Sequence, residues 1–167
     1  MTVVFCHGLE GSPQGKKAQA LRAAGLDVVA PDFTGQDLAA RVATLLPVLA
    51  AHPGCTLVGS SYGGLAALCG AILHTRAGGR IRGLVLCAPA LLRSEPPADV
   101  TGLAPPCPTI CIHGRRDALI PVDLVEAWAA RHANVALELR DDEHVLANSL
   151  DRIVAAAAQF ESQAQRE

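Results

Sequence analysis

The sequence has few aromatic side chains and little charge. Of its 167 residues, 3% are aromatic and 18% are charged, and the formal net charge is -2. This balance gives no electrostatic reason to expect a nucleic acid or an anionic membrane surface as a partner. No apolar run approaches the roughly 20 residues that a membrane-spanning helix needs. Half of the residues are hydrophobic, so we expect a folded core, and the length fits one ordinary domain over residues 1–167.

The cysteines lack the spacing of a metal site. No pair has the C-x-x-C pattern, and Cys107 and Cys111 have no matching pair elsewhere, which argues against zinc. Most of the six lie in apolar segments, where a free thiol packs as a small hydrophobe. The amino terminus has neither the basic region nor the cleavage pattern of a signal peptide. We therefore expect a reduced, cytoplasmic protein.

Short β-branched runs alternate with longer helical patterns. This alternation predicts right-handed crossovers and a mostly parallel sheet covered by helices on both faces, a three-layer doubly wound α/β fold. We expect strands at 2–5, 27–30, 56–59, 81–88, 108–114 and 135–140. The expected helices cover 13–25, 37–51, 62–75, 121–132 and 145–163.

Several details sharpen this interpretation. Ser12 is a candidate N-cap with Pro13 in the first helical position, and Pro47 is expected to kink or break its helix. The helix from Tyr62 is apolar on nearly every face and should be buried. The proline-rich segment 91–108 is expected to be a loop with at most a short helix.

The segment Gly59–Gly63 reads GSSYG and fits G-x-S-x-G with Ser61 at its centre. A serine at a tight turn from a strand into a helix projects clear of the sheet, and the helix amino terminus supplies amides for developing negative charge. Glycines two before and two after the serine let the chain approach its neighbours closely. The plainer alternative makes Ser60 or Ser61 an ordinary N-cap, but the strand before and the buried helix after favour a nucleophile at Ser61.

A serine nucleophile needs a base, and the base needs an orienting acid. Among six histidines, His144 follows the last expected strand, at the same edge of the sheet as Ser61. Asp117 follows the fifth strand and is the preferred acid, although it could simply cap a turn. Asp141, Asp142 and Glu143 are closer to His144 in sequence, but neighbours on a tight loop rarely reach the ring nitrogen that faces away from the serine.

Backbone amides would hold the oxyanion of an acyl intermediate. Tyr62 supplies one by following Ser61. The turn after the first strand, FCHGLEGSP, supplies the other, with Leu9 the best candidate and Glu10 a weaker one. His7 is then a structural residue of that turn.

The motifs HGLEGSP, PDFTGQD, GSSYGG, HGRRDALIP and a late EH stand in the order seen in the α/β-hydrolase superfamily, from His7 to His144. The short chain, its HG…SP…K-A start and its GSSYGG look most like small bacterial esterases of the YqiA type, which have no large lid or cap domain. The resemblance implies Ser61, Asp117 and His144 as the triad, Leu9 and Tyr62 as the oxyanion hole, and no metal or organic cofactor.

The chain also departs from its superfamily pattern. The usual first two strands are absent, which predicts the strand order 2-1-3-4-5-6 with the site at the switch point between the first and third strands. Asp142 stands where many relatives have glycine, so the shape of the loop that carries His144 is left open.

The expected activity is hydrolysis of small carboxylic esters with short to medium acyl chains, through an acyl-enzyme on Ser61. Leu119, Ile120 and the 91–108 segment are the expected walls of the site. An acyl thioesterase with the same triad remains an alternative, as does a non-catalytic binding module of the same fold.

A phosphate-binding loop in GLEGSPQGKK fits poorly. Only three residues separate Gly11 from the Gly15–Lys16 pair, and Lys17 stands where a magnesium-binding Ser or Thr belongs. Lys16 and Lys17 are better explained as the solvated first turn of a helix.

Overall fold

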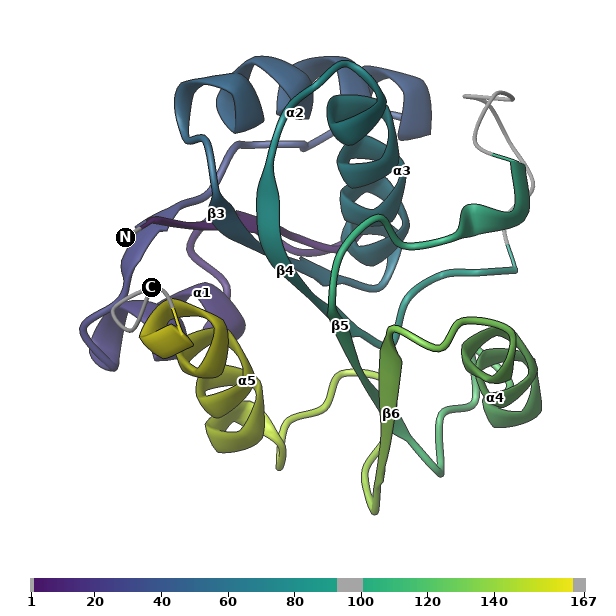
Figure 1. Cartoon of the computed structure of the whole chain (residues 1–167). Coiled ribbons are helices and arrows are strands. Elements are labelled where there is room, and N and C mark those ends of the chain that lie inside the picture. The colour runs from purple at the N-terminus through teal and green to yellow at the C-terminus, as the bar shows by residue number, and fades with distance from the viewer. Residues whose placement is uncertain (1, 93–100, 164–167) are drawn as a thin grey trace.

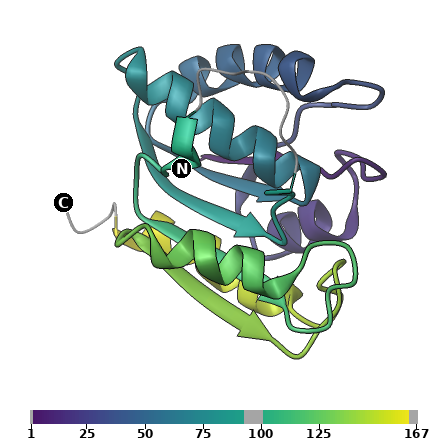
Figure 2. The ribbon, with the colours of Figure 1, turned by 90° about the vertical axis from the view of Figure 1, so that its right-hand side faces the viewer.

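The computed structural model describes residues 2–92 and 101–163. The described chain forms a six-stranded sheet in the order β2-β1-β3-β4-β5-β6, and every neighbouring pair is parallel. Accordingly, the strand arrows point the same way in Figure 2. This topology confirms the predicted order. The strands are β1 (Thr2–Cys6), β2 (Asp27–Val29), β3 (Cys55–Ser60), β4 (Ile81–Cys87), β5 (Thr109–Gly114) and β6 (Val135–Arg140).

Helices cover both faces of this sheet (Figure 1). One face packs against α2 (Leu38–Ala51), α3 (Tyr62–Arg76) and α4 (Val122–Ala130), and the other against α1 (Lys16–Ala23) and α5 (Leu150–Gln163). Alternate residues of β1 serve the two cores, because successive side chains of a strand point to opposite faces. Val4 lies in the first core and Val3 in the second. Within the described residues, no helix is both long and apolar enough to cross a membrane.

Nearly every residue of α3 is buried, as its composition predicts. The helix lies between α2 and strands β3 and β4. This central position explains why the helix that follows the proposed nucleophile carries almost no polar face.

The first helix begins later than predicted. Its N-cap is Gly15, and Ser12 and Pro13 lie in the preceding turn. The Ser12 carbonyl accepts the Gly15 N–H at 3.0 Å, and the Ser12 hydroxyl accepts the Gln14 N–H at 3.2 Å. Pro13 therefore occupies the second position of a turn, which its fixed φ also suits.

The second helix does not break at Pro47. It runs from Leu38 to Ala51 and is capped by Asp37, whose carboxylate accepts the Ala40 N–H at 2.9 Å. Leu45 and Leu49 on either side of the proline are fully buried, and this packing outweighs the loss of one helical hydrogen bond.

The six cysteines are free and buried. Burial raises the pKa of Cys87 to about 12 and that of Cys55 to about 11, so these thiols stay protonated and unreactive at neutral pH. In the described part of the chain, no cluster of three or more His, Cys, Asp or Glu side chains could hold a metal ion. Of the segment 91–108, residues 101–103 form a short 3-10 turn, η1 (Thr101–Leu103), and 93–100 lie outside the described residues.

Candidate active site

Ser61 lies where β3 ends and α3 begins, at the carboxyl edge of the sheet. The strands beside β3 are β1 and β4. From β1 the chain continues into α1 on one face, and from β3 it continues into α3 on the other. The serine therefore occupies the predicted switch point, where chains diverge and leave a crevice.

The backbone of Ser61 is strained. Its φ of 53° and ψ of -117° lie outside the regions that a side chain normally allows. Neighbouring groups hold it there: its N–H donates to the Cys87 carbonyl at 2.8 Å, and its own carbonyl accepts the N–H of Gly64 at 2.9 Å and of Ala90 at 3.0 Å. Strain of this kind at a serine is a feature of nucleophile elbows.

Two glycines make the elbow sterically possible. A Cβ at Gly63 would lie 2.3 Å from the carbonyl oxygens of Cys6 and His7. A Cβ at Gly59 would lie 2.6 Å from the Gly63 carbonyl. The first turn of α3 thus packs directly on the backbone that leaves β1, as the glycine spacing predicts.

The structure brings three of the predicted residues into one hydrogen-bonded line. The Ser61 Oγ lies 2.8 Å from His144 Nε2, and His144 Nδ1 lies 2.7 Å from Asp117 Oδ2. A carboxylate can only accept, so the imidazole proton sits on Nδ1 and Nε2 is free to accept the serine hydroxyl proton. The arrangement can deprotonate the serine and stabilise the imidazolium that results.

Asp117 is oriented from both sides. Its Oδ1 accepts the N–H groups of Leu119 and Ile120, each at 2.8 Å, and its side chain is fully buried. Sequence reasoning missed His113, whose Nε2 lies 3.0 Å from the Ile120 carbonyl and 3.6 Å from Asp117 Oδ2. Only its place at the end of β5, just before the turn that carries Asp117, could have indicated that His113 contacts this turn.

Two acidic neighbours of His144 in the sequence face Arg116 and not the imidazole ring. Asp141 Oδ1 lies 2.9 Å from Arg116 Nε, and Glu143 Oε1 lies 3.8 Å from the same guanidinium. Both carboxylates are exposed. Asp117, rather than either of these, contacts the His144 ring.

Asp142 determines the shape of the loop that the sequence left open. The buried carboxylate accepts the Ser149 hydroxyl at 2.8 Å, the Glu143 N–H at 2.8 Å and the Asn148 N–H at 2.9 Å. Burial alone would raise the pKa of Asp142, but these hydrogen bonds lower it below its ordinary value. The loop they close also delays the last helix, which begins at Leu150 and not at the predicted Val145.

A cleft of about 580 Å³ opens over the serine. Its walls include the predicted residues Leu9, Tyr62, Leu119 and Ile120, together with Leu92 from the 91–108 segment. The large exposed hydrophobic side chains of the described chain all gather on this cleft: Leu9, Leu92, Leu119 and Val145.

Lys17 also lines the cleft, contrary to the prediction of a solvated first turn. Its Nζ donates to the Val145 carbonyl at 2.6 Å, beside the proposed base. Burial lowers the pKa of Lys17. Lys16, one position earlier, is exposed as predicted. Lys17 therefore points from the first turn of α1 toward the loop of His144.

No protein-family model and no curated protein matches the sequence, but solved structures do. A protein from Xanthomonas campestris pv. campestris described as a hydrolase of the alpha/beta superfamily is 26% identical, with a TM-score of 0.79 over 97% of this chain and 98% of that one. Est1E from Butyrivibrio proteoclasticus is 16% identical, with a TM-score of 0.81 over 99% and 88%. A thermophilic esterase from Thermogutta terrifontis is 17% identical, with a TM-score of 0.75 over 98% and 90%. The chain therefore has the α/β-hydrolase fold, and its structural neighbours include hydrolases and esterases of that superfamily.

Proposed function

We propose that this protein is a serine hydrolase that cleaves small carboxylic esters through an acyl-enzyme on Ser61. The observation that carries the proposal is the line of hydrogen bonds from Ser61 through His144 to Asp117, at 2.8 and 2.7 Å. The strained serine backbone and the cleft above it support the same conclusion. A binding module would need none of this alignment.

The reaction has two steps. Ser61 Oγ attacks the acyl carbonyl while His144 Nε2 takes the hydroxyl proton, and the C=O electron pair moves to the oxygen. The amides of Leu9 and Tyr62 hold that oxyanion. When the carbonyl re-forms, the alcohol leaves with the proton from His144. Water then attacks the acyl-enzyme, again giving its proton to His144, and Ser61 leaves with that proton as the acid is released.

The cleft favours an apolar acyl group. Ala90, Leu92, Leu119 and Ile120 follow β4 and β5 and form one side of it. Their apolar side chains gain about 25 cal/mol for each Å² that a bound substrate covers. We therefore propose short to medium acyl chains as substrates, bound against Leu119 and Ile120.

Labelling with a fluorophosphonate and mapping the modified peptide tests this function. We expect the adduct on Ser61, and hydrolysis of p-nitrophenyl butyrate that is lost in Ser61→Ala. Ser60→Ala is the matched control, because Ser60 also lines the cleft but does not bond to His144; it should retain most of the turnover. A folded protein that takes no label and cleaves neither this ester nor butyryl thioesters would contradict the proposal and favour a binding module. Thioester cleavage alone would leave the mechanism but change the substrate.

A further inference from the structure

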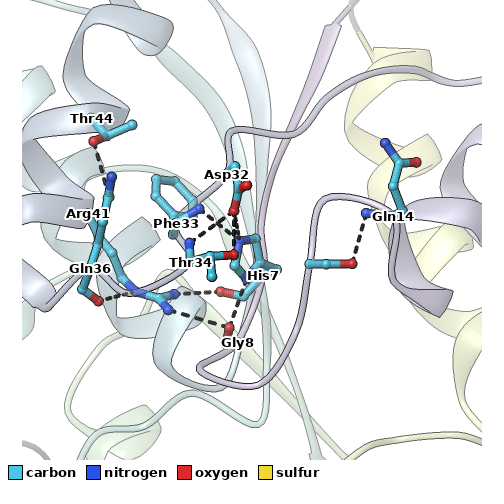
Figure 3. A network of polar contacts seen from close by, with 10 residues as sticks. His7, Gly8, Gln14, Asp32, Phe33, Thr34, Gln36, Arg41 and Thr44 are labelled. Atoms are coloured by element: carbon cyan, nitrogen blue, oxygen red, sulfur yellow. Dashed lines mark hydrogen bonds and ion pairs between the residues drawn. The ribbon is translucent and has the colours of Figure 1, made fainter.

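Arg41 in α2 is fully buried, and within the described chain no carboxylate lies within ion-pair distance of it. Backbone carbonyls accept hydrogen bonds from its guanidinium group instead (Figure 3). Nη1 donates to the His7 carbonyl at 2.7 Å, Nε to the Gln36 carbonyl at 3.1 Å, and Nη2 approaches the Gly8 carbonyl at 3.5 Å.

Stability alone does not account for this side chain. Taking a charge out of water costs several kcal/mol, and neutral carbonyls compensate it less than a carboxylate would. An apolar side chain of similar size often serves a core equally well or better. The position of the guanidinium therefore points to a role beyond packing.

The first half of that role concerns the peptide between Gly8 and Leu9. The Gly8 carbonyl is held by His7 Nδ1 at 2.8 Å and by the Gly11 N–H at 3.2 Å, in addition to the approach of Arg41. A peptide is planar and trans, so its N–H points opposite to its C=O. Holding the Gly8 carbonyl toward the protein interior turns the Leu9 N–H the other way, and Leu9 lines the cleft with Ser61.

His7 can act in this way in one tautomer only. The Phe33 N–H donates to His7 Nε2 at 2.9 Å, so Nε2 carries no proton. The proton is therefore on Nδ1, where it is donated to Gly8 (Figure 3). Arg41 supports the same turn by holding the carbonyl of His7 itself.

The second half concerns Tyr62. The Arg41 guanidinium lies over the Tyr62 ring at 4.6 Å from its centre, within the range of a cation–π interaction. Tyr62 is the first residue of α3, and its N–H is the other proposed oxyanion donor. One buried cation thus contacts both segments that carry the proposed donors.

We infer that Arg41 is a positioning residue for the oxyanion hole: it holds the Leu9 and Tyr62 amides in one orientation before substrate arrives. This inference rests on the proposed function. Preorganised donors cost no rearrangement during the reaction, so their loss should appear in kcat more than in KM.

Arg41→Met tests the inference because it keeps an unbranched side chain about as long as the aliphatic part of arginine and removes the charge and the donors. We expect kcat for p-nitrophenyl butyrate to fall about 10- to 100-fold, part of the loss that follows removal of an oxyanion donor, with KM within about twofold. The inhibition constant of an alkyl trifluoromethyl ketone, whose adduct on Ser61 places an oxyanion in the hole, should weaken by a similar factor. Thr44→Val is the matched control, since Thr44 bonds only to Gln36 in this network (3.1 Å); it should change neither quantity.

Arg41→Lys, which keeps the charge and one donor, should show an intermediate loss and is measured as well in case Arg41→Met does not fold. Wild-type kcat and ketone affinity in a folded Arg41 variant would overturn the inference and leave the proposed function standing. A loss of kcat without a matching loss of ketone affinity would also overturn it, because a general structural defect has that signature. An inactive wild-type protein that binds no ketone would instead contradict the proposed function.

Discussion

His144 Nδ1 lies 2.7 Å from Asp117 Oδ2, and the two residues come from loops that follow the neighbouring parallel strands β5 and β6. Backbone hydrogen bonds continue the pairing past the ends of these strands. The Arg115 N–H donates to the Arg140 carbonyl at 2.8 Å, and the Arg116 N–H donates to the Asp142 carbonyl at 3.1 Å. The base and its acid are therefore held at a separation that is set by the sheet.

The first prediction concerns this pair. Asp117→Asn should lower kcat by about 10²- to 10⁴-fold, because an amide does not hold the required imidazole tautomer or stabilise its charge. Asp141→Asn is the control: Asp141 is closer to His144 in sequence but contacts Arg116 instead, so its turnover should stay within about twofold of wild type. Steady-state kinetics with p-nitrophenyl butyrate measures both. Equal damage from the two variants would show that Asp117 has no special role.

The second prediction concerns Asp142 and pH. Its pKa is lowered in the folded protein, so its stabilising effect is fully present above the ordinary carboxyl pKa of about 4 and is lost as the pH falls through the lower folded value. Asp142→Asn should reduce the free energy of unfolding at pH 7 by about 1.5–3 kcal/mol. Both carboxylate oxygens accept hydrogen bonds, and the NH2 group of an asparagine would face a donor in place of one of them.

Urea unfolding between pH 3 and 7 measures both effects. The stability of Asp142→Asn should depend less on pH than that of wild type. Ser149→Ala removes one of the donors to Asp142. The pH dependence of its stability should lie between those of wild type and Asp142→Asn. If the free energy of unfolding of Asp142→Asn changed with pH as steeply as that of wild type, other carboxyl groups would be the cause of the acid sensitivity.

The third prediction concerns the contact between α3 and the turn after β1. Gly63→Ala should destabilise the fold by at least about 3 kcal/mol, because its Cβ would meet two backbone carbonyls that cannot move independently of the sheet. Gly64→Ala is a milder comparison in the same helical turn, with Pro89 atoms at 3.2 Å. Denaturant midpoints compare the two, and a Gly63→Ala protein as stable as Gly64→Ala would contradict the close packing.

The fourth prediction separates the adjacent lysines. Lys17→Met removes the hydrogen bond to the Val145 carbonyl. We expect kcat/KM to fall roughly 5- to 30-fold. This loss is equivalent to about 1–2 kcal/mol, which is part of the free energy that a charged hydrogen bond contributes. Lys16→Met should leave kcat/KM unchanged because Lys16 is exposed and outside the cleft. Equal rates for the two variants would restore the interpretation of both lysines as solvated.

Local signals in the chain predicted most of its strands and helices. Alternation of β-branched runs with helical patterns predicted the strands and a parallel sheet, because right-handed crossovers leave few topologies. The order of the strands was predicted from the resemblance to the α/β-hydrolase superfamily. The glycines around Ser61 selected one of two adjacent serines. Helix starts were less predictable: Pro13 suits a turn as well as a first helical position, and the Asp142 loop displaces the start of α5.

Side chains whose partners lie far away in the sequence could not be predicted in this way. Arg41 looks like an ordinary helix residue in the sequence, yet its contacts are with a turn 33 and 34 positions earlier. Lys17 meets a carbonyl 128 positions later.

The sequence by itself determined the sheet and the residue types at its carboxyl edge, since periodicity and glycine spacing act over a few residues. Only the tertiary structure decided which of those residues meet, because a hydrogen bond depends on distances and directions that packing sets. Ser61, His144 and Asp117 come into line across three loops, and Arg41 reaches the turn after β1 from inside α2.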